Sequence, residues 1–246
     1  MKIAVINFSG NVGKSTIARH LLLPRIPGAE LLSVESLNAG NEDAQVIRGR
    51  QFGELQEYLQ TIDNAVVDIG ASNVEDLLAL MHRYRGSHED FDAFVIPTVA
   101  PIKQQQDTIA TLVELARLGV PARRMKIVFN MIEHGDEVEA VFFPLLAFLR
   151  EHQIAPMSLD CRLPFNEIYR QSPGQKVDIF KLAEDDTDYK ALIVKATDSM
   201  DKLQLARKLA ARRLAIGAIP LLDACFSALG LAELIEPGDE LAVNAS

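Results

Sequence analysis

The chain of 246 residues has little cysteine and no low-complexity tract. Its two cysteines, Cys161 and Cys225, stand far apart without metal-ligand spacing, so we expect two reduced, buried thiols rather than a zinc site or a disulfide. The apolar run at residues 3–6 is too short for the core of a signal peptide, so we expect none. These scarcities exclude a disulfide scaffold and a repetitive, unfolded chain.

Positive charge is also in deficit, with 25 Lys and Arg against 34 Asp and Glu and a net charge of −9. This balance argues against a protein wrapped all over in nucleic acid, so any DNA contact must be regional. Hydrophobic residues are abundant, at 48% of the chain, and this is enough to form a large buried core. The length fits a single α/β domain.

Strand-like runs alternate with helical patterns along the chain, which predicts a mainly parallel, twisted sheet with helices on both faces. The apolar runs cover residues 2–8, 30–34, 65–68, 91–96, 125–129 and, more weakly, 155–159. Helical spacing covers residues 14–23, 51–62, 73–85, 103–118, 136–151 and 187–215. We therefore expect one domain over 1–246, with a core at 1–180, a C-terminal helical extension at 181–235 and a mobile tail at 236–246.

A glycine-rich turn follows the first apolar run and reads Ser-Gly-Asn-Val-Gly-Lys-Ser-Thr at residues 9–16. Successive backbone N–H groups and the positive end of the following helix hold an anion in such a turn. Lys14 then reaches the β- and γ-phosphates of a nucleotide and the Ser15 hydroxyl binds Mg²⁺. The predicted nucleotide contacts are Gly10, Asn11, Val12, Gly13, Lys14, Ser15 and Thr16. The alternative is a glycine-rich turn with an incidental lysine.

A second candidate for metal binding is Asp68, which ends the apolar run at residues 65–68. An aspartate at a strand end beside a phosphate loop is placed to hold Mg²⁺, and Gly70 can offer its N–H to a γ-phosphate. We therefore predict Asp68 and Lys14 as the catalytic pair, although strand-end aspartates also serve as helix caps. Ser72 or Asn73 is expected to cap the next helix.

The loop resembles the deviant phosphate loop of the ParA/MinD family, Lys-Gly-Gly-Val-Gly-Lys-[Ser/Thr]-Thr. Gly10 and Val12 to Thr16 match that pattern, whereas Ser9 replaces its first lysine and Asn11 its second glycine. In the family the first lysine reaches across a nucleotide-sandwich dimer. The resemblance implies a P-loop NTPase fold, ATP or ADP with Mg²⁺, and a nucleotide-dependent homodimer.

The first switch of that family is similar to residues 34–41, where Leu37 takes the place of an aspartate that helps to position the attacking water. An apolar side chain cannot orient a water, so this departure bears on hydrolysis rather than on binding. Glu35 or Asp43 are candidate substitutes. The alternative is a solvated surface loop.

Two later segments extend the resemblance. Asn130 directly follows the run at residues 125–129, at the predicted end of a strand. There its amide can donate to and accept from an adenine edge. Residues 163–177 are similar to the MinD-like loop that closes over the base, and this implies a base contact from Pro164. Ordinary strand-end turns are the alternative.

The combination of residues 7–15 with residues 67–72 resembles the StbB family of plasmid stability proteins of conjugative plasmids. That resemblance implies a role in plasmid maintenance and in positioning plasmid DNA for conjugation. The implied partners are plasmid partition or conjugation proteins. The implied location is the bacterial cytoplasm, with association to nucleoid or membrane as an alternative.

The C-terminal third combines a basic and an apolar segment. Residues 195–213 carry a local charge of +4 and a helical apolar spacing, Leu203, Ala206, Leu209, Ala210 and Leu214, which predicts a helix that is apolar on one side and basic on the other. Such a face can hold DNA phosphates or anionic lipid, or it is a solvated face of a packed helix. Residues 214–231 are apolar but include Pro220 and Asp223, so we expect core packing or a dimer contact, with peripheral membrane contact as an alternative.

Three functions remain open on the sequence. The first is a nucleotide switch with weak or partner-stimulated ATPase activity. The second is an adaptor that holds nucleotide without turnover, which the departures at Ser9 and Leu37 favour. The third is a small-molecule kinase or synthetase, for which no substrate-binding charge cluster stands near the loop.

Overall fold

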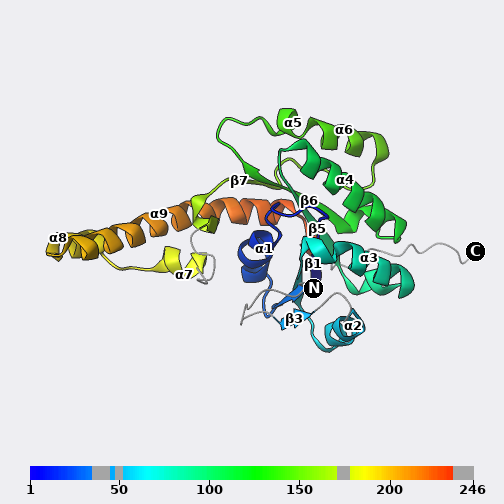
Figure 1. Cartoon of the computed structure of the whole chain (residues 1–246), viewed down its shortest axis with the longest axis horizontal. Coiled ribbons are helices and arrows are strands. Elements are labelled where there is room, and N and C mark those ends of the chain that lie inside the picture. The colour runs from blue at the N-terminus through cyan, green and yellow to red at the C-terminus, as the bar shows by residue number, and fades with distance from the viewer. Residues whose placement is uncertain (35–44, 48–51, 171–177, 235–246) are drawn as a thin grey trace, which may run out of the picture.

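A computed structural model of the protein describes residues 1–34, 45–47, 52–170 and 178–234 (Figure 1). Its centre is a parallel sheet of seven strands in the order β3-β2-β4-β1-β5-β6-β7. The strands are β1 (Lys2–Val5), β2 (Glu30–Val34), β3 (Gln45–Ile47), β4 (Ala65–Ile69), β5 (Ala93–Thr98), β6 (Met125–Ile132) and β7 (Arg162–Pro164).

The helices lie on both faces of this sheet. They are α1 (Lys14–Thr16), α2 (Phe52–Thr61), α3 (Val74–Arg83), α4 (Ile102–Arg117), α5 (Val138–Val141), α6 (Phe143–His152), α7 (Ile179–Glu184), α8 (Tyr189–Lys195) and α9 (Ser199–Ala228). α1 continues without a break as π-helical turns over Ile17–Leu22 and a 3₁₀ turn over Leu23–Arg25. α9 extends well beyond the sheet, and α7 and α8 lie beside its free half (Figure 1).

Alternation along the strands divides the core between the two faces. In β1, Ala4 belongs to the cluster covered by α2, α3, α4 and α6, whereas Ile3 and Val5 belong to the cluster covered by the α1 segment and α9. Leu222 of α9 lies in that second cluster and is fully buried. The C-terminal half of α9 is thus part of the layer that covers the sheet.

The predicted fold class is confirmed: the sheet is parallel, helices flank it on both faces, and a long C-terminal helix is present. The expected strand at residues 155–159 is wrong, because pairing with β6 begins only at Arg162, opposite Phe129. β3 is a strand that the sequence did not predict. The tail at 236–246 lies outside the described residues, and the division of the chain at residue 180 stays a prediction.

The helix expected over residues 187–215 is in fact two helices. The first ends at Lys195. Asp198 caps the second, since its carboxylate accepts hydrogen bonds from the N–H groups of Met200 (2.7 Å) and Asp201 (3.0 Å). α9 then runs through Gly217 and Pro220. Both residues disfavour a helix interior, so burial of the neighbouring turns against the sheet overrides local propensity.

The division of α9 into an apolar and a basic side is also wrong. Leu203 (44%), Ala206 and Ala210 are exposed, whereas Leu209 and Leu214 are half-buried. At about 100° per residue, Arg207 and Arg213 point in different directions around the helix axis. The predicted apolar side is therefore uncovered over much of its length, and the basic residues are spread around the helix.

Within the described residues, one helical stretch, Ser199–Leu234, is long and apolar enough to cross a membrane, with a mean hydropathy of 1.9 in its best window. Of that window, 33% is buried inside the protein. Leu222 and Cys225 pack against the sheet, and Asp223 accepts hydrogen bonds from Arg25. Length and composition thus permit a span, whereas this packing uses part of the same surface.

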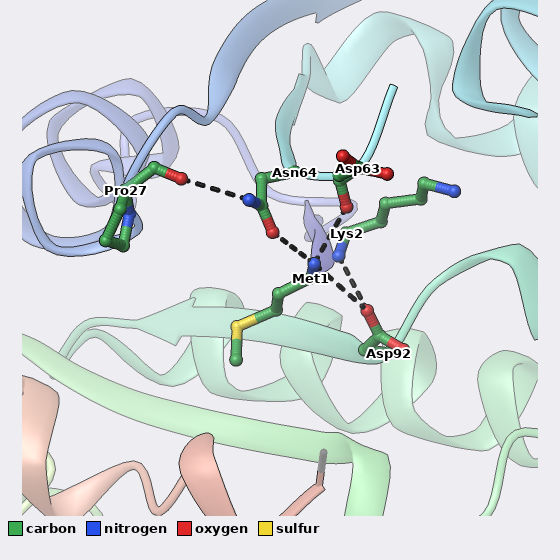
Figure 2. A network of polar contacts seen from close by, with 6 residues as sticks. All are labelled: Met1, Lys2, Pro27, Asp63, Asn64 and Asp92. Atoms are coloured by element: carbon green, nitrogen blue, oxygen red, sulfur yellow. Dashed lines mark hydrogen bonds and ion pairs between the residues drawn. The ribbon is translucent and has the colours of Figure 1, made fainter. Parts of the chain in front are cut away.

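A polar network joins the amino-terminal ends of the central strands, where β1, β4 and β5 begin (Figure 2). The amino group of Met1 donates to Asn64 Oδ1, and Asn64 Nδ2 donates to the Pro27 carbonyl (3.0 Å). Asp92 accepts a hydrogen bond from the Lys2 N–H (2.7 Å) and lies 3.9 Å from the Met1 amino group. These bonds join the start of β1 to the segments that enter its two neighbours.

We expect Asn64→Ala to lower the free energy of unfolding by about 1–2 kcal/mol, because two partners of the amide lose their hydrogen bonds. Urea denaturation of the wild type and the variant, both with a free Met1 amino group, measures the difference in the free energy of unfolding. Asp63→Ala is the matched control, since Asp63 contributes its carbonyl to Met1 (2.8 Å). Equal losses in the two variants would contradict the role of the Asn64 side chain.

Candidate functional site

The glycine-rich loop lies at the carboxyl edge of the sheet, between β1 and α1 and above the central strand. β1 has β4 on one side and β5 on the other, so the connections from β1 and β4 leave in opposite directions across the sheet. In open α/β sheets the crevice at such a switch point is where ligands bind. The fold therefore places the predicted loop at the expected position for a ligand.

Gly13 occupies a position that admits no side chain. Its φ angle is +89°, and a Cβ there would lie 2.2 Å from Asn130 Nδ2. That amide donates to the carbonyl of Val12 (2.9 Å), and Asn130 is 3% exposed. Asn11 adopts a φ of +57°, and Gly10 and Asn11 are exposed. The outer part of the loop thus faces solvent, while Val12 and Gly13 are held against β6.

The ammonium of Lys14 turns back onto its own loop. Its Nζ donates to the carbonyls of Ser9 (2.6 Å) and Asn7 (3.0 Å). Burial lowers the pKa of Lys14 to about 8, and the charge of Asp68 opposes that shift. The charge of Asp68 thus acts on a buried, poorly hydrated ammonium. The catalytic roles of Lys14 and Asp68 stay predictions.

Asp68 lies at the carboxyl end of β4, in register with Val5 of β1 and Ser33 of β2. It is 7% exposed, whereas Ser15, near the start of α1, is exposed. A carboxylate and a hydroxyl are hard oxygen ligands of the kind that Mg²⁺ takes beside phosphate oxygens, so these donors fit that ion. Among the described residues no group of three or more His, Cys, Asp or Glu is placed to hold a metal. The Mg²⁺ assignment to Ser15 and Asp68 stays a prediction.

The start of the loop is anchored by polar side chains that sequence reasoning missed. Asn7 Nδ2 donates to the Pro97 carbonyl (2.9 Å) and to Thr108 Oγ1 (2.8 Å), and its Oδ1 accepts from the Ser9 N–H (2.7 Å). The N–H of Phe8 donates to Thr111 Oγ1 (3.1 Å). The available signal was an asparagine that interrupts an apolar strand just before a glycine-rich turn.

Ser9, which replaces the family lysine, is buried and 7% exposed. Its carbonyl accepts from Lys14 and its N–H donates to Asn7, so its backbone is part of the loop's internal bonding. Residues 35, 37, 40, 41 and 43, the predicted first switch with Glu35 and Leu37, lie outside the described residues.

Gly70 and Asn73 share one acceptor at the end of β2. The Gly70 N–H and Asn73 Nδ2 both donate to the carbonyl of Val34, each at 3.0 Å. Asn73 is the residue before α3, as expected, but its side chain makes no capping bond to that helix. The N–H predicted to meet a γ-phosphate is thus engaged here with the strand that leads into residues 35–44.

Pro164 ends β7 opposite Ile132 of β6, two residues beyond Asn130. Both predicted base contacts therefore lie at the same edge of the sheet. One N–H of the Asn130 amide is used by Val12, which leaves its Oδ1 and second N–H for other partners. The base contacts of Asn130 and Pro164 stay predictions.

The helix that follows the loop is joined to α9. Arg25, at its end, donates to the carbonyls of His20 (2.9 Å) and Leu21 (3.0 Å) through Nη1. Its Nε (3.0 Å) and Nη2 (2.6 Å) donate to Asp223. The Arg25 guanidinium therefore bridges the helix that follows the loop and α9, which also pack together in one apolar cluster.

Comparison with known proteins rests on structure, since no protein-family model and no curated protein matches the chain. Apo McdA from Cyanothece is 12% identical over 94% of this chain and 98% of its own, with a TM-score of 0.52. The chain therefore shares the fold of that structure, a parallel sheet with helices on both faces and a long C-terminal helix. This likeness covers both the sheet and the C-terminal helices, because nearly the whole of each chain is aligned.

Two further structures fall below a TM-score of 0.5 and add nothing to that conclusion. The ATP complex of a single-residue variant of McdA from Cyanothece is 13% identical over 99% of this chain and 98% of its own, with a TM-score of 0.49. MinD from Aquifex aeolicus is 13% identical over 85% of this chain and 96% of its own, with a TM-score of 0.46.

Proposed function

We propose that the protein is an ATP-binding, Mg²⁺-dependent nucleotide switch of the ParA/MinD type that acts in plasmid stability and in positioning plasmid DNA for conjugation. The observation that carries the nucleotide part is the buried Lys14 ammonium beside Asp68, under a glycine-rich loop at the switch point of the sheet. The plasmid role rests on the StbB-like residues 7–15 and 67–72. The proposal includes a cytoplasmic location and partners among partition or conjugation proteins.

Each residue has one role in this proposal. Backbone N–H groups of residues 10–16 bind the phosphates, with Lys14 supplying positive charge to the β- and γ-phosphates. Ser15 and Asp68 hold Mg²⁺, which would neutralise phosphate charge. Asn130 and Pro164 contact the base. The loop is already anchored by Asn7 and Asn130, so binding orders little additional backbone.

The switch itself is the hydrogen bond between the Gly70 N–H and the Val34 carbonyl (3.0 Å). If Gly70 turns its N–H toward a γ-phosphate, the Val34 carbonyl loses one of its two donors. Val34 leads directly into residues 35–44. The presence of the γ-phosphate is thereby coupled to the segment that resembles the family's first switch.

A nucleotide-dependent homodimer through the loop edge is part of the proposal. Ile102 begins α4 and Phe143 begins α6, and they are 63% and 61% exposed. Gln105 of α4 donates to the Val141 carbonyl (2.8 Å), so these two helix starts are adjacent at the carboxyl edge. Exposed apolar side chains beside a ligand site favour contact with another protein.

An adaptor that binds nucleotide without turnover is the second candidate. Ser9 favours it, because a short, buried side chain cannot supply the charge that the family's lysine brings to a neighbouring protomer. Binding is common to both candidates, and only turnover separates them.

For binding, we expect Lys14→Ala to lower the affinity for a fluorescent ATP analogue at least about tenfold in the presence of Mg²⁺. The reason is the loss of a charge-assisted hydrogen bond to phosphate. A fluorescence titration measures it. Lys190→Ala, at an exposed lysine of α8, is the control and should bind as the wild type does. Equal affinity of the wild type and Lys14→Ala for the analogue would contradict the proposal.

Affinity should also depend on pH. The Lys14 pKa of about 8 rises when phosphates surround the ammonium, so binding takes up a proton above pH 8. Affinity therefore falls as pH rises, by about tenfold between pH 7 and pH 9 if Lys14 alone is responsible. Lys14→Arg keeps its charge over this pH range, so its affinity should fall less between pH 7 and pH 9. An equal fall in affinity for the wild type and Lys14→Arg would contradict the assignment to Lys14.

For turnover, we expect slow phosphate release that depends on Lys14 and increases with plasmid DNA and partner proteins. The assay compares wild type with Lys14→Ala at saturating ATP and Mg²⁺. Release by the wild type that never exceeds the Lys14→Ala background, with binding intact, would establish the adaptor instead.

A further inference from the structure

Met131 has a backbone conformation that a methionine seldom adopts. Its φ angle is +56°, in the left-handed region, where a residue with a Cβ is strained. Two other described residues apart from glycine share that region, Asn11 and Gln153. Asparagine tolerates it, and Gln153 follows the end of α6, where helices commonly close in this way. Met131 lies within β6, so neither reason applies to it.

A bulge in β6 accompanies this strain. Phe129 is opposite Arg162 of β7, whereas Ile132 is opposite Pro164, so three residue steps on β6 meet two on β7. Bulges are frequent next to active sites, where the extra residue changes the direction of a side chain. The bulge lies at the carboxyl end of β6, and Met131 is part of it.

The side chain of Met131 extends to the phosphate loop. A Cβ built at Gly13 would lie 3.4 Å from Met131 Cε and 2.2 Å from Asn130 Nδ2, so the thioether and the amide approach the same glycine. Met131 directly follows Asn130 in the chain, and the next residue, Ile132, pairs with Pro164. Met131 is therefore adjacent to the loop and to both predicted base contacts.

Packing in the core does not account for the strained conformation. Met131 is half-buried, and within the described part of the chain it belongs to none of the three apolar clusters. Its neighbour Ile132 does pack against one of them. Strained residues persist where the surrounding structure holds them in place, and they gather at ligand sites. A strained, half-exposed apolar side chain outside the core is what a ligand contact requires.

We propose that Met131 is a further specificity-determining residue, whose thioether packs on the purine base of the bound nucleotide. This contact presupposes the nucleotide site proposed above. Backbone N–H groups and Lys14 meet the phosphates there, so the aromatic base is the part of the nucleotide that suits an apolar side chain. Sulfur beside an aromatic ring is favourable, and a flexible thioether adapts to the shape of its partner. Asn130 contacts the edge of the base in this arrangement, and Met131 contacts its face.

Calorimetric titration with ATP and with tripolyphosphate, each in the presence of Mg²⁺, tests this contact, because only ATP carries a base. Met131→Gly should lower the affinity for ATP about tenfold, through loss of the sulfur contact and of buried apolar area. Its affinity for tripolyphosphate should stay that of the wild type. Lys14→Ala, in contrast, should lower both affinities.

Three further measurements separate a lost contact from a damaged fold. Glycine adopts the left-handed conformation freely, so Met131→Gly should keep the melting temperature of the wild type. Gln153→Gly is the matched control at an exposed residue outside the site, with a φ of +50°, and it should bind ATP as the wild type does. Met131→Leu keeps an apolar side chain of similar size and should retain most of the affinity for ATP.

Two results would overturn this contact alone. One is an equal loss of affinity for ATP and tripolyphosphate in Met131→Gly, because the side chain would then only support the loop. The other is ATP affinity in Met131→Gly equal to that of a wild type that does bind ATP. A wild type that binds no ATP would instead overturn the proposed nucleotide site, and the contact with it.

Discussion

The turn from β1 into α1 leaves no room for a side chain at position 13, and the candidate site depends on that close approach. Asn130 occupies the space because its amide donates to the Val12 carbonyl, which joins the loop to β6. Asn7 joins the other side of the loop to the end of β5 and to α4. Buried polar bonds on both sides give the loop its shape without help from a ligand, and a preformed loop loses less entropy when it binds one.

The same close packing determines the charge of the site. A buried ammonium is costly unless it has partners, and Lys14 finds them in two carbonyls of its own loop and in the charge of Asp68. The loop therefore holds its cation in place before an anion arrives. Ser9, whose carbonyl is one of those partners, is confined to the interior of the loop.

α9 relates this site to the rest of the molecule. Its C-terminal half packs on the sheet beside the phosphate-loop helix, and Arg25 bonds that helix to Asp223. Its N-terminal half leaves the sheet together with α7 and α8 (Figure 1). α9 therefore contacts both the core of the sheet and the helices α7 and α8.

The sequence by itself determined the phosphate loop, the parallel sheet from its strand–helix alternation, and Asp68 at a strand end, because each depends on residues close together in the chain. It could not determine that Asn130 would hold Val12, which is 118 residues away. Nor could it determine the short edge strand β7 or the passage of α9 through Gly217 and Pro220. Those features were decided by tertiary structure, since burial against distant segments outweighs the local propensities that a sequence displays.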